Sequence, residues 1–100
     1  GKVKRRLRTG QMPVEAAIDL HGMRVEEARD ALGSFLHGVL GRGCRCVRVV
    51  HGKGRRSPGG EGVLRRKVQG WLTRRQEVLA FASCPPHDGG TGAVYVLLKK

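Results

Sequence analysis

The chain has 100 residues, which is enough for one small domain with one hydrophobic core. Its 20 lysines and arginines outnumber its 8 acidic residues, so the net charge is +12 at pH 7. Fourteen of these cations are arginines, whose planar guanidinium group suits bidentate phosphate contacts. This composition favours nucleic acid or another anionic surface as the partner. No run of about 18 apolar residues and no signal peptide is present, so we expect no membrane span and a cytoplasmic location.

The three cysteines do not form a metal-binding pattern. Their number is odd, and Cys44 and Cys46 are too close together for a C-x₂-C half-site. We therefore expect buried or half-buried thiols, together with Cys84, in a reducing compartment. Four aromatic residues are too few for the base-stacking platform of a single-strand binder.

The first half of the chain predicts a basic arm, a strand and a helix. Residues 1–13 begin with five cations at positions 2–8 and show no apolar periodicity, so we expect a flexible arm that ends a longer N-terminal region. Residues 16–20 predict a short strand that places Asp19 and His21 on the same face. Apolar spacings of three and four predict an amphipathic helix over residues 25–40.

The second half predicts three more strands and one more helix, which has a basic outer face. Strands are expected at residues 44–50, 78–83 and 92–99, and the helix at residues 63–75. The resulting order, β-α-β-α-β-β, predicts an α/β fold. We expect a two-layer sandwich, a four-stranded mixed sheet with two helices on one face, over residues 14–100. The two crossovers predict parallel pairing that brings the third strand next to the first, and the last two strands are expected to be antiparallel.

Two polar motifs follow the first two predicted strands. Asp-Leu-His-Gly occupies residues 19–22, and His-Gly-Lys-Gly occupies residues 51–54. The carboxyl ends of parallel strands meet at the sheet edge where α/β folds build their sites. The side chains of Asp19, His21, His51 and Lys53 are therefore expected to converge there.

A third motif, Gly-Gly-Thr-Gly-Ala at residues 89–93, completes a set that resembles the Smr (small MutS-related) domain. The resemblance covers residues 14–100, and the basic segment before them is similar to that of the short stand-alone bacterial members. It implies a nucleic-acid endonuclease that nicks DNA or cleaves RNA, including messenger RNA on stalled ribosomes, and so a role in DNA repair or ribosome rescue. It also implies that Asp19, His21 and His51 are the key residues, whereas the position of Lys53 varies in the family.

The residue types fit phosphodiester cleavage independently of that resemblance. The reaction needs a base, an acid and cations near the phosphoryl group, and histidine serves either proton role. His21 and His51 are candidate base and acid in either order, and Asp19 orients an imidazole, stabilises an imidazolium or holds a metal ion. RNA cleavage by a histidine pair needs no metal ion. DNA lacks the 2′-hydroxyl, so Mg²⁺ or Mn²⁺ is expected as a cofactor if DNA is the substrate.

Glycines and cations around the motifs and on the second helix are expected to bind the substrate backbone with little sequence specificity. These residues are Gly52, Lys53, Gly54, Arg55, Arg56, Arg65, Arg66, His87, Gly90 and Thr91. The alternative is a non-catalytic DNA- or RNA-binding module that targets a larger protein, in which Asp19 is a turn residue and His51 is structural. A domain that binds acidic protein partners is a third interpretation. The sequence leaves the oligomeric state open and is compatible with a monomer.

Overall fold

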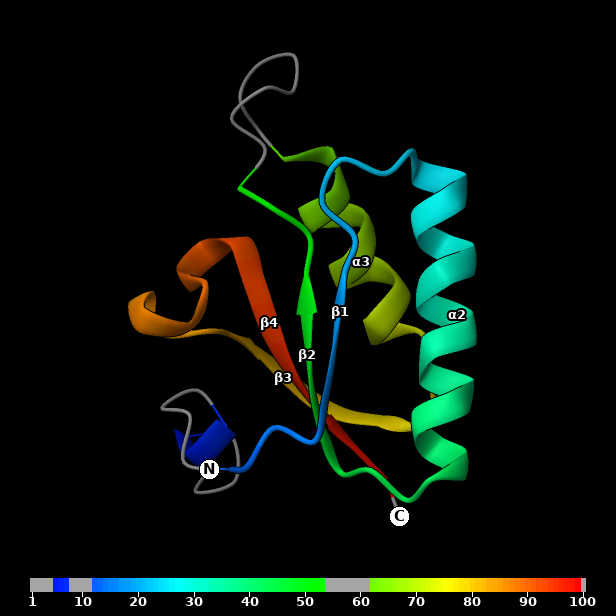
Figure 1. The fold of residues 1–100 in the computed structure, drawn as a ribbon, viewed down its shortest axis with the longest axis vertical. Helices are drawn as coiled ribbons and strands as arrows, with labels where there is room; N and C mark the ends of the chain where they lie inside the picture. The colour runs from blue at the N-terminus through cyan, green and yellow to red at the C-terminus, as the bar shows by residue number, and fades with distance from the viewer. Residues whose placement is uncertain (1–4, 8–11, 54–61, 100) are drawn as a thin grey trace.

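A computed structural model describes residues 5–7, 12–53 and 62–99. The elements follow the predicted order, with two short 3-10 turns between the last two strands. They are β1 (Ala16–Asp19), α2 (Val25–Gly41), β2 (Cys46–Val50), α3 (Val63–Thr73), β3 (Val78–Ser83), η2 (Pro86–Asp88), η3 (Gly90–Gly92) and β4 (Ala93–Leu98). Figure 1 shows both helices on one side of a single sheet, which confirms the predicted α/β architecture. Among the described residues, no helix has the length and apolarity that a membrane crossing requires.

The strand order differs from the prediction. The sheet runs β1-β2-β4-β3, with β1 parallel to β2 and with β4 antiparallel to both of its neighbours. The expectation that β3 lies next to β1 is therefore wrong, because β3 forms the opposite edge. All six residues of β4 are buried, and an apolar strand of this kind belongs in the interior of the sheet. On β3, by contrast, the side chain of Leu79 is 52% exposed, as an edge strand tolerates.

The main core lies between the sheet and the two helices. The buried positions of α2 recur at spacings of three and four, which is the amphipathic pattern the sequence predicts. Val68 and Leu72 of α3 are one turn apart and pack into the same cluster as Val47 and Val49 of β2. The odd-numbered residues of β2 therefore face the helices, since strand side chains alternate between the two faces of a sheet.

The other face of the sheet holds a second, smaller apolar cluster. It contains Cys46, Cys84, Tyr95 and Leu97, and all three cysteines of the chain are free and buried. Leu7, in the helical segment of residues 5–7, is fully buried in this cluster. The prediction of an arm did not foresee this contact, in which the apolar side chain of Leu7 packs on a sheet surface that α2 and α3 leave uncovered.

Candidate active site

The first two motifs meet at the carboxyl ends of β1 and β2, as the sequence predicts. Asp19 is the register partner of Val50, and the Leu20 amide donates a 2.7 Å hydrogen bond to the Val50 carbonyl. Gly52 follows with a φ of +86°, and a Cβ atom at Gly52 would lie 3.2 Å from the Cβ of His21. Only glycine combines this left-handed conformation with so close an approach. The two motifs are therefore in direct contact through their backbones.

The third motif joins them through β4. The Gly92 carbonyl accepts hydrogen bonds from the amides of His51 (3.0 Å) and Gly52 (2.9 Å). A Cβ atom at Gly92 would lie 3.1 Å from Cγ of Lys53, so the two chain segments are tightly packed. All three motifs thus form one continuous edge of the sheet, although β3 is not adjacent to β1.

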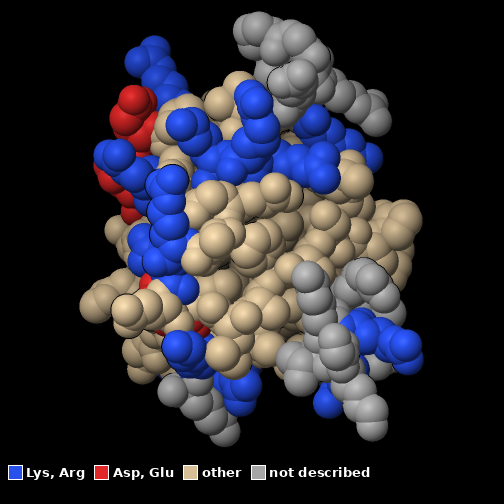
Figure 2. All heavy atoms as spheres, turned by 180° about the vertical axis from the view of Figure 1, so that it is seen from behind, with Lys and Arg blue, Asp and Glu red and all other residues tan. Residues whose placement is uncertain are grey.

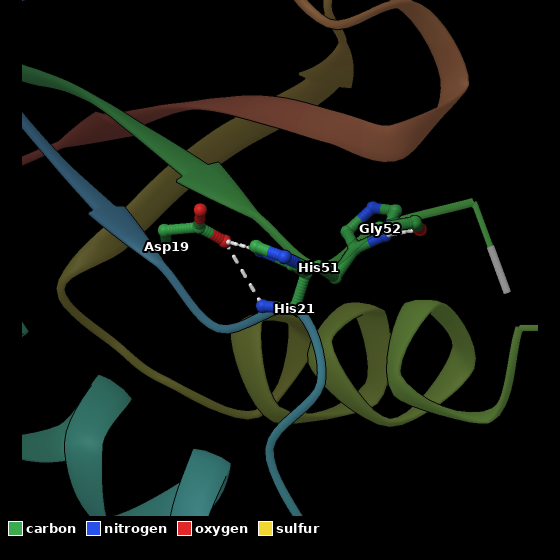
Figure 3. Close-up of polar contacts among 4 residues, drawn as sticks. All are labelled: Asp19, His21, His51 and Gly52. Carbon is green, nitrogen blue, oxygen red and sulfur yellow. Dashed lines mark hydrogen bonds and ion pairs between the residues drawn. The ribbon is translucent and has the colours of Figure 1, made fainter.

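Asp19 and His21 form an exposed carboxylate–imidazole pair at this edge (Figure 3). Oδ1 of Asp19 lies 2.6 Å from Nδ1 of His21 and also accepts the His21 backbone amide at 3.0 Å. Partial burial alone would raise the pKa of Asp19, but the His21 hydrogen bonds and, more weakly, the charges of His21 and Arg48 lower it below its usual value. Because an ionised Asp19 only accepts hydrogen bonds, Nδ1 of His21 carries a proton and Nε2 is the atom left to exchange one. The two side chains are 55% and 68% exposed, so a substrate can reach them.

His51 has a different environment from His21. Figure 3 shows its ring pointing away from the Asp19–His21 pair, and the residue is only 4% exposed. Its Nδ1 donates a 2.7 Å hydrogen bond to the Gly52 carbonyl, and its buried Nε2 has no hydrogen-bond partner among the described residues. Burial lowers the pKa of His51, the Gly52 bond opposes this, and the charge of Arg65 lowers it further. His51 is therefore neutral at pH 7, with an unpaired lone pair on Nε2.

Both imidazoles were expected to converge with Asp19. The backbones of the two motifs do meet, but only the ring of His21 lies beside Asp19, and the ring of His51 points away (Figure 3). His51 continues the alternation of Val47 and Val49, which face the helices, whereas Asp19 lies on the opposite face with its register partner Val50. The sequence already shows that His51 occupies the same alternating positions as Val47 and Val49, and the sequence interpretation missed this signal.

We expect the burial of His51 to make the domain less stable below neutral pH. The unfolded chain takes up a proton near the ordinary histidine pKa of about 6.5, whereas folded His51 stays neutral to lower pH. Stability is therefore lost as the pH falls from 6.5 through the lowered folded pKa, a window above that of the carboxylates. His51→Asn, whose amide can still donate to the Gly52 carbonyl, should shrink the difference in Tm between about pH 7.5 and pH 5. His37→Asn, an exposed site on α2, should keep the wild-type difference, and equal pH responses in both variants would contradict this prediction.

The other predicted substrate-binding residues are only partly brought together. Lys53 and Thr91 are exposed and Gly90 is half-buried beside the joined motifs. His87 is exposed in η2, and the reason for placing it at the site, adjacency of β3 to β1, is wrong. Gly54, Arg55 and Arg56 lie outside the described residues.

Cations form a surface band on the helix side of the molecule. Figure 2 shows lysine and arginine side chains across the upper part of that face, with the larger patches of carboxylate along its left edge. On α3, Arg66 and Lys67 are exposed and Arg65 is half-buried. Nη1 of Arg75 donates a 3.0 Å hydrogen bond to Oε1 of Glu77. We therefore do not count Arg75 among the cations that can bind a phosphate backbone.

The described residues do not assemble a metal site by themselves. No group of three His, Cys, Asp or Glu side chains among them is placed to hold a metal ion. Oδ1 of Asp19 is occupied by two hydrogen bonds from His21, and His51 points away. Mg²⁺ and Mn²⁺ prefer several oxygen ligands, and at this edge Asp19 supplies a single carboxylate.

One charged cluster beside the site was not predicted from the sequence. Arg48, in the middle of β2, has its Nε 3.6 Å from Oδ1 of Asp88. The hydroxyl of Tyr95 donates a hydrogen bond to Oδ2 of Asp88, and burial first, then this carboxylate, raises the pKa of Tyr95. An arginine two residues before the second strand ends was the available sequence signal.

Comparison with known proteins agrees with this geometry, since the family model of the Smr domain matches residues 18–99. The chain belongs to the Smr family. It is 40% identical over 95 residues to a protein named "Probable DNA endonuclease SmrA" from Escherichia coli K12, covering 95% of this chain and 51% of that protein. It is 37% identical over 94 residues to "Ribosome rescue factor SmrB" from Aliivibrio fischeri, covering 94% of this chain and 50% of that protein. The Smr chain thus spans about half the length of the curated relatives it matches.

A solved structure of a relative has the same fold. The crystal structure of YdaL, a stand-alone small MutS-related protein from Escherichia coli, matches with a TM-score of 0.83 and 39% sequence identity. The match covers 96% of this chain and 73% of that one. The resemblance that the three motifs indicated is therefore confirmed at the level of family and fold.

Proposed function

We propose that this Smr domain is an endonuclease that cleaves the phosphodiester backbone of nucleic acid with little sequence specificity. The observation that carries the proposal is the exposed Asp19–His21 pair, 2.6 Å apart at the edge where all three motifs meet. A carboxylate-oriented imidazole on the surface of a strongly basic domain is suited to proton transfer at a phosphate. One relative, named as a probable DNA endonuclease, supports the same chemistry, and another, named as a ribosome rescue factor, supports an RNA-containing partner.

Each side chain has a distinct role in this proposal. Asp19 holds the Nδ1 proton of His21 and stabilises the imidazolium that forms when Nε2 takes a proton from the attacking oxygen. The same imidazolium can then return that proton to the leaving oxygen. Lys53 neutralises phosphoryl charge. His51, neutral and buried, holds the Gly52 turn against His21, and its Nε2 lone pair can act as a base only when substrate binding gives access to it.

The residues at the site favour RNA over DNA as the substrate. In RNA the 2′-hydroxyl next to the phosphate supplies the attacking oxygen, so proton transfer by His21 suffices. In DNA water must attack. If a divalent ion takes part, Asp19 is the residue that would hold it, and the ion would supply an activated water. The relatives' names, a probable DNA endonuclease and a ribosome rescue factor, support extending the proposal to DNA as a substrate and to the ribosome as a partner. Branched DNA, ribosome-bound messenger RNA and a cytoplasmic location are further parts of the proposal.

A cleavage assay with both substrates tests this proposal. End-labelled single-stranded RNA and supercoiled plasmid are each incubated with Mg²⁺ and with EDTA, using wild type and the Asp19→Ala/His21→Ala double variant. RNA cut in EDTA by wild type alone is the expected result. Plasmid nicked by wild type alone, and only with Mg²⁺, would support DNA cleavage with a metal ion at Asp19. Equal traces of activity from both proteins would indicate contamination and remove the endonuclease proposal.

The second candidate function is a binding module without catalysis, and the sequestered ring of His51 favours it. The basic band on α3 would then contact the phosphate backbone while the domain delivers a larger protein to DNA or RNA. In that case the double variant would bind nucleic acid as wild type does, and neither protein would cut. Binding that does not weaken between low and moderate salt would contradict both functions, because phosphate contacts release counterions.

A further inference from the structure

A charged side chain outside the three motifs shares a sheet face with the Asp19–His21 pair. Arg48 is the register partner of Ala17 on β1 and of Tyr95 on β4. Asp19 lies two residues after Ala17, so its side chain leaves the sheet on the same side as that of Arg48. The positive charge of Arg48 acts on the Asp19 carboxylate accordingly. Arg48 therefore faces the exposed pair, whereas His51 faces the helices.

The Asp88 carboxylate fixes the position of this guanidinium group. One oxygen of Asp88 faces Nε of Arg48 at 3.6 Å, and the other accepts the hydroxyl of Tyr95. At 3.6 Å the contact is an ion pair and not a hydrogen bond. Within residues 5–7, 12–53 and 62–99, the guanidinium group of Arg48 makes no hydrogen bond, so its Nη donors remain available. Its side chain is 29% exposed, which leaves part of the group accessible from solvent.

A glycine of the third motif keeps the space beside Nη1 of Arg48 open. Gly89 has a φ of +108°, and a Cβ atom there would lie 2.9 Å from Cβ of Ala93 and 3.5 Å from Nη1 of Arg48. Glycine at this position thus removes the side chain that would otherwise contact the guanidinium group. Three residues later, the Gly92 carbonyl accepts hydrogen bonds from the backbone amides of His51 and Gly52 in the second motif. Arg48 therefore lies between the Asp19–His21 pair and the third motif.

We propose that Arg48 binds the non-bridging oxygens of the phosphate that is attacked at the Asp19–His21 pair. This inference rests on the proposed function and adds the residue that holds the reacting group. A guanidinium group with free donors binds two phosphate oxygens at once and stabilises the charge that develops on them. Asp88 and Tyr95 are positioning residues, because they contact Arg48 or its carboxylate partner and not the substrate.

The competing explanation is that Arg48 only neutralises Asp88 within the fold. Three variants separate the two: Arg48→Ala, Arg48→Lys, which keeps the charge but loses the planar fork, and Arg29→Ala. Arg29 is an exposed arginine of α2 whose one ion pair among the described residues is with its neighbour Asp30, so its loss controls for the change in net charge. Thermal unfolding of each variant shows whether it is folded.

The decisive measurement is single-turnover cleavage at saturating protein, on an RNA oligonucleotide with one stereopure phosphorothioate at its main cleavage position. Wild type should discriminate between the two diastereomers, because sulfur replaces an oxygen that Arg48 contacts. Arg48→Ala should cleave the unmodified RNA about 10²–10³-fold more slowly and lose this discrimination. Arg48→Lys should lie between them, and Arg29→Ala should match wild type. A folded Arg48→Ala protein with wild-type rate, or with intact discrimination between diastereomers, would overturn the proposal.

A binding measurement keeps this inference separate from the proposed catalysis. If wild type cleaves nothing, the endonuclease proposal fails, and the affinity for a single-stranded oligonucleotide is then measured at several salt concentrations. Arg48→Ala should reduce the slope of log K against log salt by about 0.7, the value for one phosphate contact, relative to Arg29→Ala. Equal slopes for these two variants would show that Arg48 contacts no phosphate.

Discussion

Replacing His21 by Ala should lower the single-turnover cleavage rate by about 10²–10⁴-fold, the usual contribution of a positioned acid–base group. Asp19→Asn should lower it by roughly 10²-fold, because the amide no longer fixes the Nδ1 proton of His21 or stabilises its imidazolium. The combined variant should be no slower than His21→Ala alone. Asp19 acts through His21 in this mechanism, so its removal costs nothing further once the imidazole is gone.

This non-additivity distinguishes two roles for Asp19. If Asp19 instead holds a metal ion independently of His21, the double variant will be slower than either single variant by roughly the product of their effects. Asp30→Asn and His37→Ala are matched controls, because both residues are exposed on α2, away from the three motifs. Each should retain the wild-type rate. A loss of activity in either control would show that the measured effects are not specific to the site.

Gly52→Ala should destabilise the fold by about 1–2 kcal/mol, since an alanine is strained at a left-handed φ of +86°. Its methyl group would also lie 3.2 Å from Cβ of His21, so His21 must move away from Asp19 or the turn must shift. For a domain of this size, each kcal/mol corresponds to a decrease in Tm of about 4–8 °C. Cleavage should decrease as well, because the Asp19–His21 pair depends on this contact.

Gly70→Ala makes the same chemical change, but we expect it to stabilise the domain and not to destabilise it. Gly70 lies inside α3, and nothing outside its own helix lies within 4 Å of the position that a Cβ would take. Alanine there should stabilise the domain by roughly 0.5–1 kcal/mol. Thermal unfolding of both variants checks the pair of predictions. If Gly52→Ala is as stable as wild type, the close approach of the first two motifs does not exist in solution.

Local sequence patterns were sufficient for the elements and for part of the site. The apolar spacing of α2 and α3 matches their buried faces, and the helices lie where the periodicity placed them. The contact of Asp19 with His21 joins residues two apart at the end of β1, and the alternation expected of a strand over residues 16–20 predicts it. The meeting of the first two motifs follows from parallel pairing of β1 with β2, which a single helical crossover favours.

Strand order was not determined by those patterns. Insertion of β4 between β2 and β3 depends on which strand can bury both of its faces, a competition among segments far apart in the chain. The position of Leu7 on the sheet face that α2 and α3 leave uncovered has the same cause, since an apolar side chain within a run of cations gives no local sign of a partner. Both outcomes reflect burial of apolar surface across the whole sheet.

The sequence by itself determined the family, the order of elements and the adjacency of Asp19 and His21, because these depend on motifs and on short-range periodicity. Only the tertiary structure decided that His51 is buried and neutral, and that Arg48 lies with Asp88 and Tyr95 beside the exposed pair. The reason is physical: the burial of an imidazole and the environment of a guanidinium group depend on what packs around them. For Arg48 those neighbours come from β4 and from the β3–β4 connection, more than 35 residues away in the chain. For His51 they include Arg65 of α3, which lowers its pKa.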